Sequence, residues 1–283
     1  MLAILLYFNY WHGLQKLSVG GNSTKAGDFI GYYLLYFIPF ATAFLLQLFF
    51  YKNCNYFKNT WFWIILFLAP AIFSFRVNFN FYSQWINEAF KGTDQYFYLH
   101  TLSWVVRVVV LLTPVYIIWL LKDKNKQPFY GTKALQIVKP YVIMLLIMIP
   151  LIALASTQKD FLHMYPKAAF MSNMPATGSS RILQYISFEL TYGLDFVSIE
   201  YFFRGFLILG LMRICGEHCI IPVACFYCTI HFGKPMAEAI SSFFGGMLLS
   251  IICYNTGSIW GGLIIHLGIA WMMEVGGLVG NSF

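Results

Sequence analysis

The chain has few charged residues for its length. Of its 283 residues only 10% are Asp, Glu, Lys or Arg, whereas 59% are hydrophobic and 20% are aromatic. Soluble domains carry about 25% charged and about 45–50% apolar residues, so this composition excludes an ordinary soluble fold. The sequence also lacks internal repeats, low-complexity tracts and any helix-turn-helix, zinc-finger or stacking-sheet pattern. We therefore expect no nucleic acid among its partners.

The apolar residues gather in segments long enough to cross a bilayer as helices, which takes about 17–25 residues each. We predict an all-α fold, a polytopic membrane helix bundle of about eight transmembrane helices. The expected location is integral to a membrane, multi-pass, in a prokaryotic cell (inner) membrane, with the lipid bilayer as surroundings. The candidate spans are residues 31–51, 60–76, 101–121, 138–156, 182–214, 219–232, 236–254 and 257–279.

The beginning of the chain, MLAILLYFNYW, is apolar but shorter than a span. It has neither the basic first region nor the small-residue cleavage site of a signal peptide, so we predict an interfacial or partial span within an N-terminal segment of residues 1–30. A loop at 157–181, with Pro166, Pro175 and Gly178, indicates a soft boundary. It separates N-terminal transmembrane helices (31–156) from a C-terminal domain (180–283).

Basic residues are concentrated after residue 121. Cytoplasmic loops carry an excess of Lys and Arg, so we place this stretch in the cytoplasm and both termini on the opposite side. The net charge of +7 then fits loops that face anionic lipid headgroups. The residues concerned are Lys122, Lys124, Lys126, Lys133 and Lys139.

The six cysteines raise the question of a metal site, above all Cys225 and Cys228 with His231. Residues three apart on a helix turn by about 300°, so these three side chains drift around the axis and do not converge easily on one tetrahedral ion. Haem attachment needs His directly after the second Cys, where Thr229 stands. Buried cysteines commonly pack as small apolar residues, so we expect no metal and no other cofactor.

Polar groups appear within apolar segments near the C-terminal end. Glu200 and Arg204 lie in SIEYFFRGFLILGL, His231 in CFYCTIHFGKP and His266 in GSIWGGLIIHLGIAWMME. A charge at membrane depth costs several kcal/mol, at least about 2.5 on insertion scales, so such residues usually mark a site. The i,i+4 spacing of Glu200 and Arg204 favours an ion pair. An isolated buried histidine is more often a hydrogen-bonded core residue, but four such groups together predict a shared polar cavity.

Three motifs resemble those of the CPBP family of intramembrane proteases, also called the CAAX-protease and bacteriocin-processing or Abi family. They are Glu200-Tyr-Phe-Phe-Arg204-Gly205, His231-Phe-Gly-Lys-Pro235 and Ser258-Ile-Trp260-Gly-Gly-Leu-Ile-Ile-His266, within about residues 182–280. The resemblance implies an all-helical membrane core in which a glutamate activates water, two histidines support it, and a peptide bond is cut within or beside the bilayer. It implies Glu200, Arg204, His231 and His266 as catalytic residues, and a peptide or membrane-protein substrate.

This chain departs from the family pattern at three positions. The first family motif has two consecutive glutamates, the leading one taken as the base, and that position here is Ile199. The third family motif has Asn or Asp four residues after its histidine, where Ala270 stands. The second has Phe four residues before its histidine, where this chain has Tyr227.

The chemistry leaves open which residue is the general base that takes a proton from water. Burial favours a proton-accepting Glu200, whereas the neighbouring Arg204 favours a purely ionic role. Either histidine can position water, stabilise an oxyanion or act as base. Arg107, inside another apolar segment, is expected to meet Asp195, Glu189 or a lipid headgroup. Carboxylates that can substitute for the missing base are Asp195, Glu189, Glu238 and Glu274.

Two classes of function remain after these considerations. The first is a membrane-embedded endopeptidase of the CPBP type that uses water as nucleophile. The second is a non-catalytic relative that keeps the fold and serves as a membrane binding or bacteriocin-immunity-type protein. A transporter is less favoured, because the polar residues cluster in one part of the chain and no duplicated half is present.

Overall fold

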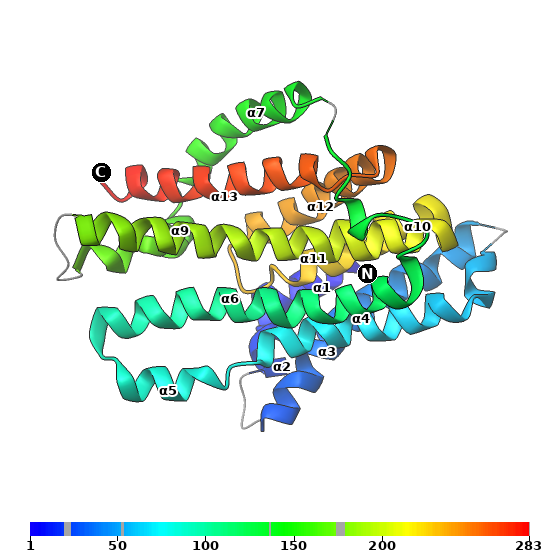
Figure 1. Cartoon of the computed structure of the whole chain (residues 1–283), viewed down its shortest axis with the longest axis horizontal. Helices are drawn as coiled ribbons and strands as arrows, with labels where there is room; N and C mark the ends of the chain where they lie inside the picture. The colour runs from blue at the N-terminus through cyan, green and yellow to red at the C-terminus, as the bar shows by residue number, and fades with distance from the viewer. Residues whose placement is uncertain (20–23, 52–53, 136, 174–178, 283) are drawn as a thin grey trace. The chain divides into compact units, whose positions relative to one another are not determined.

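The computed structural model describes residues 1–19, 24–51, 54–135, 137–173 and 179–282 (Figure 1). Within these ranges the regular structure is helical, and the extended chain pairs only at one isolated bridge, between Thr132 and Ser258. The predicted all-α class is confirmed. A chain whose apolar surface faces lipid must satisfy its backbone groups internally, and helices do so within each segment.

Six helical stretches of the described chain are long and apolar enough to cross a membrane. A seventh, Lys139–Ala155, is apolar but shorter. The multi-pass membrane architecture agrees with the sequence, while the count of about eight spans stays a prediction. The expected spans at 182–214 and 219–232 fall in one long helical stretch. The six are Lys25–Phe50, Thr60–Ala89, Gly92–Asp123, Ser180–Thr229, Met236–Thr256 and Trp260–Gly280.

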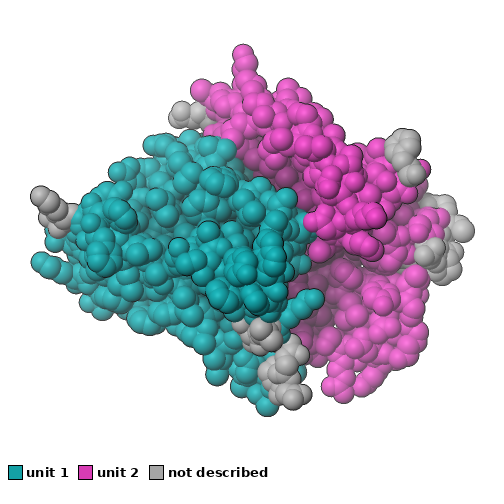
Figure 2. Space-filling model, turned by 180° about the vertical axis from the view of Figure 1, so that it is seen from behind, with its two compact units in different colours: residues 1–78, 111–134, 200–262 teal, residues 79–110, 135–199, 263–283 magenta. Residues whose placement is uncertain are grey.

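The chain divides into two compact units, coloured separately in Figure 2. Unit 1 consists of residues 1–78, 111–134 and 200–262, and unit 2 of residues 79–110, 135–199 and 263–283. Each unit is therefore built from stretches that are distant in the sequence. Glu200, Arg204 and His231 belong to unit 1, and His266 belongs to unit 2.

Unit 1 contains the first four α-helices and most of the C-terminal motif region. These are α1 (Leu2–His12), α2 (Leu14–Val19), α3 (Lys25–Phe50), η1 (Asn55–Lys58), α4 (Thr60–Asn78), the end of α6 (Gly92–Ile118), η2 (Trp119–Asp123), η3 (Phe129–Gly131), η5 (Tyr201–Leu209), α10 (Gly210–Cys215), η6 (Gly216–Cys219), α11 (Ile220–Thr229) and α12 (Met236–Thr256). Both η2 and η5 are π-helices. Helix α11 packs against α3 and α12, and α3 packs against α4.

Aromatic rings form the core of unit 1. Phe73 of α4 is fully buried and lies 5.4 to 5.8 Å, centroid to centroid, from Phe202, Phe203 and Phe226. Edge-to-face and tilted ring pairs at such distances each add about 0.5–1.5 kcal/mol to the burial of the rings themselves. This core joins α4 to η5, which carries Arg204, and to α11, which ends just before His231.

A polar strap, residues 124–134 of unit 1, contacts η5 through η3. Ile259 N–H donates to Gly131 O at 3.1 Å, and Ser258 Oγ donates to Lys133 O at 2.7 Å. The fully buried Tyr130 donates its hydroxyl to Asp123 Oδ2 at 2.9 Å. Burial and the neighbouring Asp123 carboxylate raise the pKa of Tyr130 above its ordinary value, so the phenol stays a neutral donor.

Unit 2 has an aromatic core of its own. It comprises α5 (Tyr82–Ala89), most of α6, α7 (Lys139–Ala155), α8 (Lys159–Met164), η4 (Lys167–Asn173), α9 (Ser179–Glu200) up to Ile199, and α13 (Trp260–Gly280) from Leu263. Trp104 packs on Phe188 and Tyr192 at 4.9 and 5.1 Å. Ala270 is buried in the same cluster. The position where the family has Asn or Asp is therefore an apolar packing position here.

Candidate functional site

The ion pair predicted from spacing is present at the start of η5. Arg204 Nη1 lies 3.3 Å from Glu200 Oε1, and the side chains are 1% and 0% exposed. Helix α9 ends at Glu200, and the π-helix that follows contains Arg204. Short π-helical segments are rare and occur frequently at functional sites. Two charges removed from water cost several kcal/mol each unless the geometry compensates, which sets this pair apart from the surrounding apolar core.

Tyr227 of α11 lies under the arginine. The guanidinium carbon of Arg204 is 4.3 Å from the centre of the Tyr227 ring, within the range of a cation–π interaction. The Tyr227 and His231 ring centroids are in turn 4.8 Å apart. Glu200, Arg204, Tyr227 and His231 thus form a continuous chain of contacts within unit 1.

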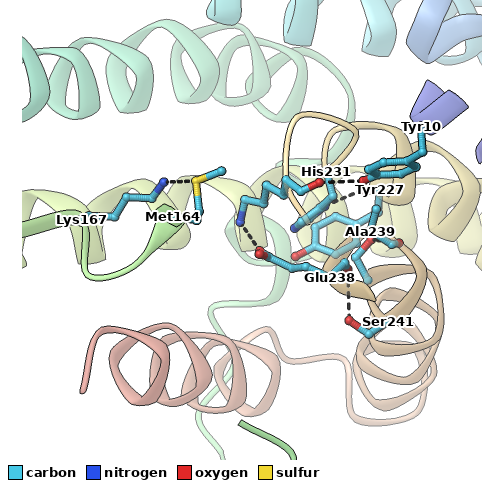
Figure 3. A network of polar contacts seen from close by, with 10 residues as sticks. Tyr10, Met164, Lys167, Tyr227, His231, Glu238, Ala239 and Ser241 are labelled. Carbon is cyan, nitrogen blue, oxygen red and sulfur yellow. Dashed lines mark hydrogen bonds and ion pairs between the residues drawn. The ribbon is translucent and has the colours of Figure 1, made fainter. Parts of the chain in front are cut away.

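His231 lies just beyond the end of α11, as the sequence predicted. It stands in the turn between Thr229 and Met236, and its side chain is buried. Figure 3 shows its Nδ1 directed at the Tyr227 carbonyl, 2.9 Å away. Because a carbonyl oxygen only accepts, Nδ1 carries the proton, and Nε2 of the neutral ring is left as an acceptor. This tautomer suits a group that takes or positions a proton at Nε2.

Two glycines make room for these side chains. A Cβ added at Gly262 would stand 2.7 Å from Glu200 Oε2, and one added at Gly246 would stand 2.7 Å from Tyr227 Cδ1. Real Cβ atoms do not approach other atoms so closely, so only glycine fits unless the neighbour moves. The glutamate and the tyrosine are therefore enclosed by backbone on one side.

We expect Gly246→Ala to lower the apparent unfolding temperature. The added methyl must push the Tyr227 ring away from its place under Arg204, and overpacking of this kind costs about 1–3 kcal/mol. Gly245→Ala is the matched control, because a Cβ at Gly245 meets no atom within 4 Å. Alanine there should raise helix stability by up to about 1 kcal/mol. Thermal unfolding of both variants in lipid nanodiscs checks this, and equal shifts would contradict the close contact at Gly246.

His266 lies on α13 in unit 2. Its ring packs edge-on against Phe196, with centroids 4.7 Å apart. The contacts of unit 1 bring together Glu200, Arg204 and His231, whereas Phe196, which packs against His266, belongs to unit 2. A cavity shared by both histidines stays a prediction from the sequence motifs.

Structural partners are identified for two of the candidate substitute bases, Glu238 and Glu274. Glu238, in the first turn of α12, forms an ion pair with Lys234, which lies in the turn that precedes this helix (Figure 3). Glu274 accepts the backbone N–H of Lys167 at 2.8 Å, at the start of η4, which suits a stabilising charge at a helix N-terminus. Glu189 and Asp195 lie on α9 in unit 2, and Arg107 lies half-buried on α6. No ion pair joins Arg107 to another residue of the described chain.

The cysteines of the motif region pack as buried side chains. Cys228 Sγ donates to Ala239 O at 3.1 Å, and Cys253 Sγ donates to Arg204 O at 3.4 Å. In the ranges that the structure describes, no group of three or more His, Cys, Asp or Glu side chains is placed to hold a metal ion. The second contact links α12 to the backbone of the arginine in the ion pair.

Tyr227 and Gly262 are contacts that sequence reasoning does not assign to the site. The i,i+4 spacing of Tyr227 and His231 indicates that their rings are neighbours, but nothing in the sequence pairs Tyr227 with Arg204 on another helix. Gly262 lies inside the third motif, four residues before His266. Its place against the Glu200 carboxylate depends on how the start of α13 meets the end of α9.

Residues 182–272 match the family described as type II CAAX prenyl endopeptidase, Rce1-like. This match is consistent with the CPBP family and confirms the resemblance seen in the three motifs. The matched segment contains Glu200, Arg204, His231 and His266. No curated protein and no solved structure matches the chain.

Proposed function

We propose that this chain is a membrane-embedded endopeptidase that cuts a peptide or a membrane-proximal segment of another protein, with water as the nucleophile and no dissociable cofactor. The expected setting is a prokaryotic cell (inner) membrane. The observation that carries the proposal is the fully buried Glu200–Arg204 pair beside Tyr227 and His231, within the segment that matches an endopeptidase family. A carboxylate, a guanidinium and an imidazole provide the groups that peptide hydrolysis needs.

In the proposed reaction, Glu200 accepts a proton from water as the water oxygen attacks the carbonyl carbon of the peptide bond. The carbonyl oxygen becomes an oxyanion, which His266 stabilises by donating a hydrogen bond, while His231 positions the attacking water as an acceptor at Nε2. The carbon–nitrogen bond then breaks, and the leaving amine takes the proton that Glu200 received. Arg204 holds the carboxylate in place through the ion pair.

Arg204 has further capacity beyond the pair. Its Nε and Nη2 donate no hydrogen bond to any residue that the structure describes. A buried guanidinium with open donors favours an incoming carbonyl or carboxylate, because unsatisfied buried donors cost about 1–3 kcal/mol each, and more when charged. This supports binding of the substrate backbone next to Glu200. His266 is included in the proposal because it is the histidine of the third sequence motif.

The alternative is a non-catalytic relative that acts as a membrane binding or bacteriocin-immunity-type protein. The observation that favours it is Ile199, a buried isoleucine where the family has its leading glutamate. A chain without that carboxylate can keep the fold and bind a peptide without cutting it.

A peptidase assay on the purified protein in lipid decides between the two. The substrates are a library of peptides with and without a C-terminal prenyl group, and mass spectrometry locates any cut. Cleavage that disappears in His231→Ala supports the endopeptidase. If the wild type and His231→Ala both retain peptides without cleaving them, the result supports the membrane binding protein.

We expect Ile199→Glu to raise the rate of cleavage. The substitution supplies the carboxylate that the family motif has at this position, next to Glu200. A well-placed general base contributes about 10²–10⁴-fold to a rate, so an increase of at least tenfold is expected if Glu200 now serves as an imperfect base. Ile199→Gln is the control of similar size without a proton-accepting group. A wild type and an Ile199→Glu variant that are both inert on every peptide would remove the endopeptidase from consideration.

A further inference from the structure

The turn that carries His231 is contacted by the first helices of the chain. Asn9 of α1 donates its Nδ2 to Phe232 O at 2.9 Å. Tyr10 donates its hydroxyl to Lys234 O at 2.7 Å (Figure 3). The two carbonyls lie one and three residues after His231. Two side chains from one end of the sequence thus bind the backbone of a motif more than 220 residues away.

A third contact comes from α2. The amide of Gln15 lies against Gly233, where an added Cβ would be 3.1 and 3.2 Å from its Oε1 and Nε2. Gln15 N–H donates to Asn9 Oδ1 at 3.1 Å, so Asn9 links α2 to the turn. Gly13, with φ of 66°, lies between the helices and allows this close return of the chain. The hairpin formed by α1 and α2 is therefore shaped to meet residues 232–234.

The opposite side of α1 is apolar and open. Ile4, Tyr7, Phe8 and Trp11 are between 46% and 63% exposed, and their i, i+3, i+4, i+7 spacing places them on one helix face. Tyrosine and tryptophan favour the boundary between lipid and water. Helix α1 is shorter than a membrane span, so this face suits a helix that lies in the membrane interface. The one buried residue of α1 is Asn9, on the side of the turn.

The backbone of the turn makes few hydrogen bonds of its own. The chain between the end of α11 at Thr229 and the start of α12 at Met236 is not helical. Its backbone hydrogen bonds run from His231 N–H to Cys228 O, from Phe232 N–H to Thr229 O and from Lys234 N–H to His231 O. A buried backbone carbonyl needs a donor, and a short turn between helices offers few. Side-chain donors from α1 supply them.

We propose that Asn9 and Tyr10 are positioning residues for His231, and that the α1–α2 hairpin is an interfacial anchor that fixes the turn at residues 230–234. Neither residue touches the reacting atoms. They act through the backbone on either side of Gly233, which sets where the His231 ring stands relative to Tyr227 and Arg204. The effect on catalysis rests on the proposed function, while the effect on the turn does not.

The test compares two tyrosines on the same helix. Tyr10→Phe removes only the hydroxyl that binds Lys234 O. Tyr7→Phe makes the same chemical change on the lipid-facing side, where the Tyr7 hydroxyl has no hydrogen bond to the described residues. Asn9→Ala is a second variant that removes the donor to Phe232 O. Hydrogen exchange measured by mass spectrometry on the full chain in lipid nanodiscs reports the opening of residues 230–235.

We expect Tyr10→Phe to speed exchange in this segment by about fivefold, the effect of one lost hydrogen bond. Asn9→Ala should speed it by about tenfold or more, because Asn9 also holds Gln15. Tyr7→Phe should leave it unchanged, and α3 should exchange as in the wild type in all three. In the peptidase assay, kcat should fall by a similar factor in the first two variants, with KM little changed.

The proposal would be overturned if residues 230–235 exchanged at the wild-type rate in both Tyr10→Phe and Asn9→Ala. So would a rise in kcat in both variants, since that would mean the hairpin covers His231 instead of positioning it. Exchange is measured without substrate. If no peptide is cut by the wild type, the proposed function fails, and the exchange result still decides whether the hairpin fixes the turn.

Discussion

Glu200→Gln is expected to reduce peptide cleavage by about 10²–10⁴-fold, the contribution of a positioned general base. Glutamine keeps the size of the side chain and can still accept a hydrogen bond from Arg204, but it cannot take a proton from water. The rate is measured on the substrate found in the peptide library. Glu217→Gln, the same change at an exposed residue of η6, should leave the rate unchanged.

The neutral glutamine also leaves Arg204 with no charged partner. Breaking one side of a buried ion pair costs about 3–5 kcal/mol, so loss of activity by itself can reflect unfolding. The double variant Glu200→Gln with Arg204→Met removes both charges and should recover much of the thermal stability without recovering the rate. Full activity in a folded Glu200→Gln protein would remove Glu200 from the mechanism and favour the binding-protein alternative.

Tyr130→Ala is expected to cause the largest loss of stability in unit 1. The ring is fully buried, its hydroxyl binds the buried Asp123, and its backbone has a positive φ of 23° that tyrosine rarely adopts. Removing a buried aromatic ring costs about 3–5 kcal/mol. Packing of the ring and its hydrogen bond hold this backbone conformation, so both supports are lost together.

Thermal unfolding of three variants separates these contributions. Tyr130→Phe keeps the ring and removes the hydrogen bond, for an expected loss of about 1–3 kcal/mol because Asp123 stays buried without its donor. Tyr96→Ala removes a ring that is 58% exposed and should cost far less. If Tyr130→Ala and Tyr96→Ala lower the unfolding temperature equally, the strap does not stabilise unit 1.

The all-helical membrane fold could be predicted from composition, because lipid leaves few alternatives to helices. The Glu200–Arg204 pair could be predicted as well, since both residues lie on one stretch of helix and their spacing alone makes them neighbours. The same holds for His231, whose position near Gly233 and Pro235 indicated the end of a helix. These features depend on residues close together in the sequence.

The contacts between distant segments could not be predicted. Tyr227 reaches Arg204 because Gly246 leaves room for its ring, and neither the spacing nor the polarity of Tyr227 carries that information. Asn9 is a polar residue in an apolar run, which signals a buried partner but does not name Phe232 O. Such pairings follow from the packing of helices in three dimensions. They become visible only in the structure.

The π-helix η5 makes the fold and the candidate site respond differently to a change in chain length. Its turns close through i→i+5 hydrogen bonds. The loss of one residue can therefore convert a turn to the α-helical i→i+4 pattern while the helix stays continuous. The N–H groups beyond the turn would then bond the same carbonyls as before, so residues after the turn would keep their direction and only the residues within it would change face relative to Glu200. A relative with one residue fewer between the positions of Glu200 and Arg204 could therefore keep the same helix while the arginine stands at a different spacing from the glutamate. Loss of function in such a relative would leave no trace in its helix count, its hydropathy or its list of conserved residue types.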